Sequence, residues 1–206
     1  QSLPIARSLE IRPKVELATA TDKPSYGMDE DVTVGVELVN TAWQKHVHLA
    51  VQVESGEGSV AARLTDEDLV LAADGRETLD YTWNTAALPA GDYRIRSTLT
   101  KDGAVLAENL VPFTIEKVLV LEGTLDLSAA SVPYGEPLRG DWVVVNEGNY
   151  DITGLAVANI LTDQAGVKLQ EWTESLDLAQ GQTVSGSFAL QTQDMPLGPY
   201  QVAMGG

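Results

Sequence analysis

The most regular feature of the sequence is an alternation of apolar and polar residues with a period of two. With Ser97 as the exception, apolar residues recur at every second position from Val32 to Leu38, Val47 to Val53, Leu79 to Trp83 and Tyr93 to Leu99. Such alternation is typical of antiparallel strands that bury one face and expose the other. No stretch of helical length shows the spacing of an amphipathic helix, so we expect an all-β chain.

Turn-forming residues separate these alternating segments. Asp102-Gly103 is the clearest hairpin signal, because Gly tolerates the positive φ of a type I′ turn. Other turns are predicted at Lys23-Pro24, Ser55-Gly56, Asp74-Gly75 and Pro89-Ala90-Gly91. About seven short strands in roughly 100 residues predict an immunoglobulin-like Greek-key β-sandwich.

The second half of the chain repeats the landmarks of the first. The segment that ends at Asn40 matches the one that ends at Asn146, and Leu88–Tyr93 matches Met195–Tyr200. The offsets are 106 and 107 positions, and intermediate landmarks keep the same order. This self-similarity predicts two tandem, homologous sandwiches.

The repeat also sets the predicted boundaries. We expect residues 1–13 to be the last strand of a preceding repeat or a linker. Residues 14–116 are the first Ig-like repeat, and residues 117–206 are the second, without its C-terminal hairpin. Gln1 stands in place of an initiator Met, which indicates that the chain was cut from a longer protein.

The prediction for the N-terminal tail rests on a short match. Leu3-Pro4-Ile5 resembles Val111-Pro112-Phe113 near the end of the first repeat. Each proline lies 22 positions before the tyrosine of a Tyr-Gly pair, Tyr26 and Tyr134. The tail therefore has the sequence character of a final strand.

Several of these motifs together resemble a known family. They are Asp22–Gly27, the Val-rich segment to Asn40, Leu71–Gly75, Trp83 and Leu88–Tyr93. In this combination they are similar to bacterial Ig-like repeats of the adhesion-related, CARDB-like type, over nearly the whole chain. The resemblance implies a spacer or adhesion module on a secreted or cell-surface protein. A small family of bacterial proteinase inhibitors has a similar strand pattern, including the late Gly-x-Tyr.

The charge of the chain limits the classes of partner that we expect. The formal net charge is −17, and the acidity is spread over both predicted repeats. Nucleic-acid partners require clustered Lys and Arg, so we expect none. No apolar stretch approaches the roughly 20 residues that span a bilayer, so we expect no membrane insertion in this segment. The chain has no cysteine, which excludes disulfides and thiolate sites.

Two features are candidates for metal binding. His46 and His48 are two positions apart on one predicted strand, so their imidazoles share a face, as two ligands of a metal ion would. Two acidic clusters in predicted loops offer the hard oxygens that calcium prefers. These clusters are Asp29, Glu30 and Asp31, and Asp66, Glu67 and Asp68. We favour outward-facing histidines and solvated acids, because no third ligand and no calcium-loop motif is evident, so no cofactor is expected.

Tryptophans are the candidates for ligand contact. Trp43 and Trp172 lie in or near predicted connections and would stack on sugar rings if exposed, whereas Trp83 and Trp142 fall on apolar faces and are expected in the core. No nucleophile motif or phosphate-binding glycine loop is present, so we expect no enzyme.

The sequence thus favours a structural or adhesive stalk module, extracellular or on the cell surface, whose partners are neighbouring Ig-like repeats of the same chain. The alternative is a carbohydrate- or protein-binding accessory module of a secreted enzyme. A proteinase inhibitor is a third hypothesis.

Overall fold

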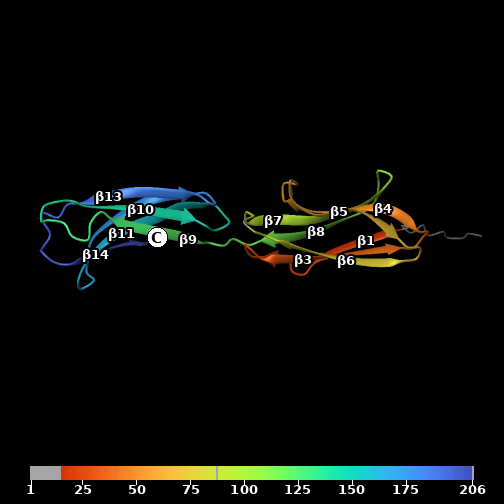
Figure 1. Ribbon diagram of the computed structural model, residues 1–206, viewed down its shortest axis with the longest axis horizontal. Coiled ribbons are helices and arrows are strands. Elements are labelled where there is room, and N and C mark those ends of the chain that lie inside the picture. Colours follow the sequence, from red (N-terminus) through yellow and green to blue (C-terminus); the bar gives the residue numbers. More distant parts are fainter. Residues whose placement is uncertain (1–14, 87, 206) are drawn as a thin grey trace, which may run out of the picture. The chain divides into compact units, whose positions relative to one another are not determined.

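The computed structural model describes residues 15–86 and 88–205, and every regular element among them is a β-strand (Figure 1). The expected all-β, Ig-like sandwich fold is confirmed. The predicted strand in residues 1–13 lies outside the described residues. The described residues contain no helix with the length and hydropathy needed to cross a membrane. They fall into two compact units, unit 1 (15–86 and 91–116) and unit 2 (88–90 and 117–205).

Unit 1 is a sandwich of two sheets. The first sheet has the order β1-β3-β6, and the second has the order β2-β8-β7-β4-β5. The first sheet contains β1 (Val15–Thr21), β3 (Asp31–Asn40) and β6 (Arg76–Asn84). The second contains β2 (Ser25–Tyr26), β4 (Lys45–Ser55), β5 (Val60–Leu71), β7 (Gly91–Lys101) and β8 (Ala104–Ile115).

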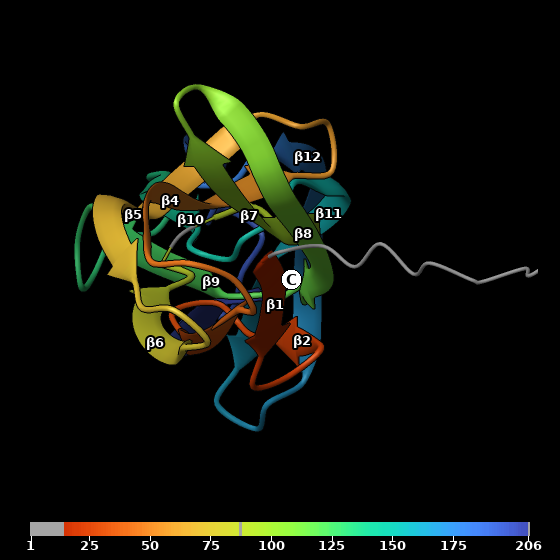
Figure 2. The same cartoon turned by 90° about the vertical axis from the view of Figure 1, so that its right-hand side faces the viewer.

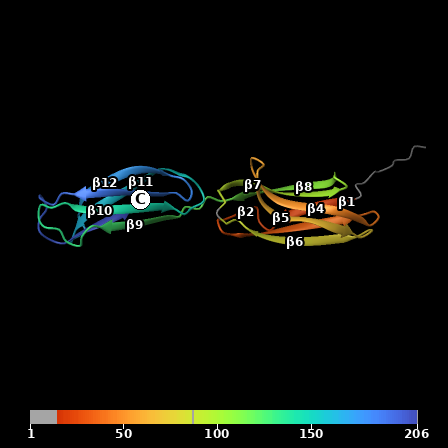
Figure 3. The same ribbon diagram turned by 45° about the horizontal axis from the view of Figure 1, so that its top comes forward.

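Unit 2 also has two sheets, which Figure 3 shows as separate layers. Their orders are β9-β10-β13 and β12-β11-β14. The first contains β9 (Leu121–Leu127), β10 (Leu138–Asn146) and β13 (Thr183–Leu190). The second contains β11 (Ile152–Asp163), β12 (Lys168–Leu178) and β14 (Tyr200–Gly205).

The two units share one strand order. The sheet β9-β10-β13 of unit 2 corresponds to the sheet β1-β3-β6 of unit 1. The sheet β14-β11-β12 corresponds to the strands β7-β4-β5 of the larger sheet of unit 1. The described part of unit 2 has no strand in the place of β2 or β8. Among the residues that the structure describes, β14 pairs with β11, whereas β7 pairs with both β4 and β8.

The core of unit 1 follows the alternation in the sequence. The predicted inward faces of β3, β4 and β7 are buried, including Ser97 in β7, whose hydroxyl accepts a hydrogen bond of 2.8 Å from Thr19. The β7–β8 hairpin, green in Figure 2, turns at Asp102 and Gly103. Their φ values of 51° and 79° are the positive pair that a type I′ turn requires, so this turn is confirmed.

The core of unit 2 centres on a tryptophan. Trp142 packs with Val144, Val157 and Leu178, as its place on an apolar face predicted. Gly186 on the neighbouring strand makes room for the indole, because a Cβ at this position would lie 2.3 Å from the Trp142 ring. A small residue beside a large one is how such interiors reach close packing.

Candidate functional site

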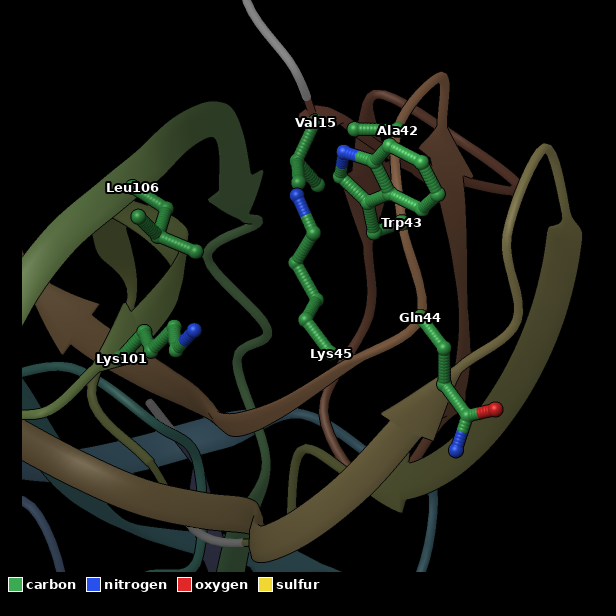
Figure 4. Close-up of a pocket in the computed structure, with 7 residues that line it drawn as sticks. All are labelled: Val15, Ala42, Trp43, Gln44, Lys45, Lys101 and Leu106. Atoms are coloured by element: carbon green, nitrogen blue, oxygen red, sulfur yellow. The ribbon is translucent and has the colours of Figure 1, made fainter.

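An open hollow of about 320 Å³ in unit 1 contains the most exposed aromatic candidate (Figure 4). Trp43, in the loop between β3 and β4, is 85% exposed. Leu106 and Lys101 line the hollow from the β7–β8 hairpin, and Lys45 lines it from the start of β4. Figure 4 shows the side chain of Gln44 pointing away from the other residues.

A buried asparagine fixes the loop that carries Trp43. Asn40, 1% exposed, ends β3. Its Nδ2 donates to the backbone carbonyls of Ala42 (3.3 Å), Trp43 (3.0 Å) and Ala72 (2.6 Å). Its Oδ1 accepts from the backbone N–H of Ala42 at 3.2 Å. The β3–β4 loop is thus tied from within to the turn after β5.

Unit 2 has the same arrangement at Asn146, which ends β10. Its Nδ2 donates to the carbonyls of Tyr150, Leu178 and Ala179 at 2.9, 3.2 and 3.2 Å. Its Oδ1 accepts from the N–H of Gly148 at 3.1 Å. Tyr150 therefore stands where Trp43 stands in unit 1. The sequence comparison aligned the two asparagines but did not reveal this role.

The chemistry of the hollow suits a ring-shaped ligand with a negative charge. An exposed indole offers a flat apolar face, and the ammonium groups of Lys45 and Lys101 bring positive charge to a chain whose net charge is −17. In unit 2, the ammonium of Lys117 lies 5.4 Å from the centre of the Tyr150 ring. Its cation–π contact occupies one face of that ring.

Trp172 is placed differently from the sequence prediction. It lies within β12 rather than in a connection, is only partly exposed, and stacks on Phe188 with ring centroids 5.7 Å apart. The charged residues around it hid the strand, because β12 exposes most of its side chains. Its indole face is engaged within unit 2.

Among the described residues, no group of three or more His, Cys, Asp or Glu side chains is arranged to hold a metal ion, at the histidine pair or elsewhere. His48 lies between two carboxylates of β5. Its Nδ1 is 3.0 Å from Asp68 Oδ1, and its Nε2 is 2.6 Å from Asp66 Oδ1. These contacts, Asp68 first, raise the pKa of His48 above its usual value. His46 shares the face but is exposed beside Val70.

The second acidic cluster is not a loop. Asp66, Glu67 and Asp68 lie within β5, so the loop prediction was wrong. Because side chains alternate along a strand, Asp66 and Asp68 lie on the face of the sheet that carries His48. Glu67 lies on the other face, where its Oε1 accepts a hydrogen bond of 3.0 Å from the Tyr81 hydroxyl. Burial, followed by the contact with Glu67, raises the pKa of Tyr81 to about 12. Strand geometry thus separates the oxygens that calcium would need to bring together.

The first acidic cluster is in a connection, as predicted, up to Asp31, which begins β3. Glu30 forms an ion pair with Lys23 and accepts from the N–H of Gly27 at 2.7 Å. Asp31 accepts from the Asn84 side chain at 2.8 Å. Two of the three carboxylates therefore serve different local contacts.

Sequence reasoning missed a buried carboxylate on the outer face of the larger sheet of unit 1. The Glu54 side chain is 6% exposed and accepts from Nε of Arg94 and of Arg96, each at 2.7 Å. Arg96 also pairs with Glu108. The hydrogen bond from Arg96 is the largest of the contacts that lower the pKa of Glu54 to about 2. Arg94 and Arg96 at alternate positions were the available signal.

Comparison with known proteins gives fold-level similarity only. No known family and no curated protein matches the chain. A CARDB domain from Pyrococcus furiosus, solved in complex with di-metal ions, is 13% identical, with a TM-score of 0.42 over 50% of this chain and 89% of that one. The C-terminal domain of wzt is 10% identical, with a TM-score of 0.41 over 52% and 76%.

A third similar structure is much larger than the matched part. The alkylpurine DNA glycosylase AlkC of Pseudomonas fluorescens, bound to DNA containing an abasic site analog, is 12% identical with a TM-score of 0.40. The match covers 50% of this chain and only 30% of the glycosylase.

Proposed function

We propose that this chain is a non-enzymatic structural or adhesive module, a stalk or spacer within a larger secreted or cell-surface bacterial protein. Its role in this proposal is mechanical. Each sandwich supplies a folded unit, and successive units of the same chain are its first partners.

The observation that carries the proposal is that the same arrangement of strands occurs in both units. Both units have the same strand order, and both tie the loop after the second long strand with a buried asparagine. Successive domains of this kind can build length from compact units, because each has its own hydrophobic core. The polar clusters of unit 1 support the proposal too, since Glu54 and His48 are held in contacts between strands.

The size and location of the native polypeptide test this proposal. An antibody against this chain should detect a large species on intact cells, and brief protease treatment of the cells should remove it. A small species that resists the protease until the cells are lysed would contradict the stalk role. A cytoplasmic marker protein serves as the control for cell integrity.

The Trp43 hollow supports a second candidate function, the binding of a glycan or protein ligand. The indole is almost fully exposed on a loop that a buried residue holds in place, and two lysines line the same hollow. Fixed aromatic anchors lose little conformational freedom on binding. Acidic oligosaccharides, such as oligomers of uronic acids, match this surface better than neutral ones.

Substitution of the indole tests this second function. If uronic-acid oligomers bind here, Trp43→Ala should weaken the affinity about tenfold or more, as expected for an aromatic anchor. Isothermal titration with the full chain measures the loss. Lys168→Gln in unit 2 is the control. It removes the positive charge of an exposed lysine that forms an ion pair with Glu171 and does not line the hollow. Equal affinity of wild type and Trp43→Ala would exclude the hollow as the binding site.

A further inference from the structure

Unit 2 has an open hollow of about 380 Å³ whose lining combines aromatic and polar residues. Its aromatic residues are Trp142, Trp172 and Phe188, and Asn159 and Glu174 contribute an amide and a carboxylate. All of its lining residues lie on β10, β11, β12 or β13, within unit 2. We call this surface the Asn159 hollow.

A buried acceptor without a partner lies at this hollow. Asn159 is on the inward face of β11, between the buried Val157 and Leu161, and is 5% exposed. Its Oδ1 is buried and accepts no hydrogen bond from the described residues. Rotation about χ2, a torsion with broad preferences, can turn this oxygen towards the hollow. Because a buried acceptor without a donor is unfavourable, a ligand that brings a donor to this position is stabilised.

The same place in unit 1 holds an apolar residue. Asn159 and Val51 each lie four positions before the end of their strand, β11 and β4. Val51 pairs with Thr65 on β5 as Asn159 pairs with Trp172 on β12. Val51 is fully buried. An amide at this position is therefore not a requirement of the fold.

A carboxylate beside this position is present in both units. Glu67 lies two positions after Thr65 on β5, and Glu174 lies two positions after Trp172 on β12. In unit 1, the hydroxyls of Thr65 and Tyr81 both donate to Glu67 Oε1, at 2.8 and 3.0 Å. The carboxylate of unit 1 is thus held by two donors of its own unit.

Unit 2 has aromatic rings in place of these two hydroxyls. Trp172 replaces Thr65, and Phe188 replaces Tyr81, because each of the latter two pairs with the residue six positions before the asparagine that ends β10 or β3. Phe188 has no hydroxyl, and within the described part of the chain no side chain donates to the Glu174 carboxylate. The hollow therefore has a second acceptor without a protein donor.

These features select the chemical class of a ligand. Asn159 and Glu174 both require hydrogen-bond donors, and the carboxylate also favours a positive charge. Residues 117–206 carry three basic residues against eleven acidic ones, which attracts cations. Aromatic rings bind cations over their faces and pack against methylene groups. An organic ammonium ion meets all of these conditions, whereas an anion would be repelled by Glu174.

We propose that the Asn159 hollow binds a small alkylammonium group, whose N–H groups donate to Asn159 Oδ1 and to the Glu174 carboxylate. The methylene groups of the ligand lie against Trp172 and Phe188. A volume of about 380 Å³ is within the range of small-molecule sites. A free diamine and the side chain of a lysine in a polypeptide present the same group. This site goes beyond the stalk function and does not depend on it.

Isothermal titration of the 206-residue chain tests the ligand class. The probes are diaminobutane with an amino group at each end, acetyl-lysine amide, and the diol that corresponds to the diamine. At least one amine should bind about tenfold or more tighter than the uncharged diol. Tighter binding of the diamine indicates a free amine as the ligand, and tighter binding of the lysine derivative indicates a polypeptide. Absence of binding by both amines, or equal binding of the diol, overturns the proposal.

Glu174→Gln tests whether the amine binds at this hollow. It removes the charge and keeps the shape, so the affinity should fall about tenfold or more. Glu171→Gln is the matched control, because Glu171 lies on the same strand, pairs with Lys168 at 2.6 Å and does not line the hollow. Equal affinities of the two variants would mean a general attraction of cations to an acidic chain, and would overturn the proposal.

Two further variants copy unit 1 into unit 2. Phe188→Tyr restores the hydroxyl that donates to the carboxylate in unit 1, so it should compete with the ligand and weaken binding. Asn159→Val introduces the residue type of Val51, so it should weaken binding about tenfold while the urea midpoint of unfolding stays equal or rises. Unchanged affinity in both variants, or a lower urea midpoint of Asn159→Val without loss of affinity, would show a purely structural asparagine and overturn the proposal.

Discussion

Two buried asparagine side chains, together with backbone hydrogen bonds, hold neighbouring loops of their units to each other. Asn40 satisfies three carbonyls and one N–H with a single side chain, and Asn146 does the same in unit 2. Both are almost fully buried. Loss of the Asn40 amide removes the hydrogen bonds of the Trp43 carbonyl and the Ala42 N–H, whereas the Ala42 and Ala72 carbonyls keep backbone hydrogen bonds from Asp74 and Gly75.

Asn40→Ala should therefore lower the free energy of unfolding of unit 1 by about 2–4 kcal/mol. Urea denaturation followed by tryptophan fluorescence measures the change. Asn84→Ala, which removes hydrogen bonds from a partly exposed amide, is expected to cost about 1 kcal/mol or less. Equal costs for the two variants would show that the buried asparagine has no special role.

The contribution of Glu54 to the free energy of unfolding of unit 1 depends on pH and is lost in acid. Its pKa falls from 4.5 to about 2 in the folded state, mainly through the hydrogen bond from Arg96. Because the folded pKa is lowered, the contribution is complete above pH 4.5 and is lost as the pH falls towards 2. Unfolding experiments from pH 7 to pH 2 should show Glu54→Gln on the order of 2 kcal/mol less stable at neutral pH, with a smaller difference in acid. Glu57→Gln, in the exposed β4–β5 turn, should leave the profile unchanged.

At the scale of elements, His48 connects β4 to β5 through its two carboxylate contacts. The raised pKa of His48 means that the protonated form is favoured in the folded state, so this contribution is present below the usual histidine pKa and is lost as the pH rises through the folded value. NMR titration should show Asp68→Asn lowering the pKa of His48, because Asp68 is the largest cause of the shift. Asp74→Asn, in the turn before β6, changes the same charge and should leave it unaltered. An unchanged titration in Asp68→Asn would contradict the bridge.

The strands that bury one face were predictable, and the most exposed ones were not. Val32 to Leu38 and Val47 to Val53 alternate clearly because every second side chain enters the core. In β5 and β12 most positions are exposed, so the acids of Asp66–Asp68 and Glu171 conceal the period. Partners across strands, such as Glu54 with Arg94, depend on register, which the composition of a single strand does not contain.

For the whole molecule, the sequence landmarks led to the correct fold class, and the homology of the two units stays a prediction. The candidate site was predictable only in part. The exposure of Trp43 follows from its place in a loop, and Lys45 is its near neighbour in the sequence, but Lys101 and Leu106 reach the same hollow from a hairpin about 60 positions away.

The buried asparagines bear on how such a chain can diversify. Asn40 and Asn146 bond to the main-chain carbonyls of Trp43 and Tyr150 in the loops. These hydrogen bonds therefore do not depend on which side chain stands at those two loop positions. One unit displays Trp43 and the other holds Tyr150 under a lysine. Substitutions at these two positions can therefore accumulate at small cost to folding, and each unit becomes a separate place where a new binding preference can arise.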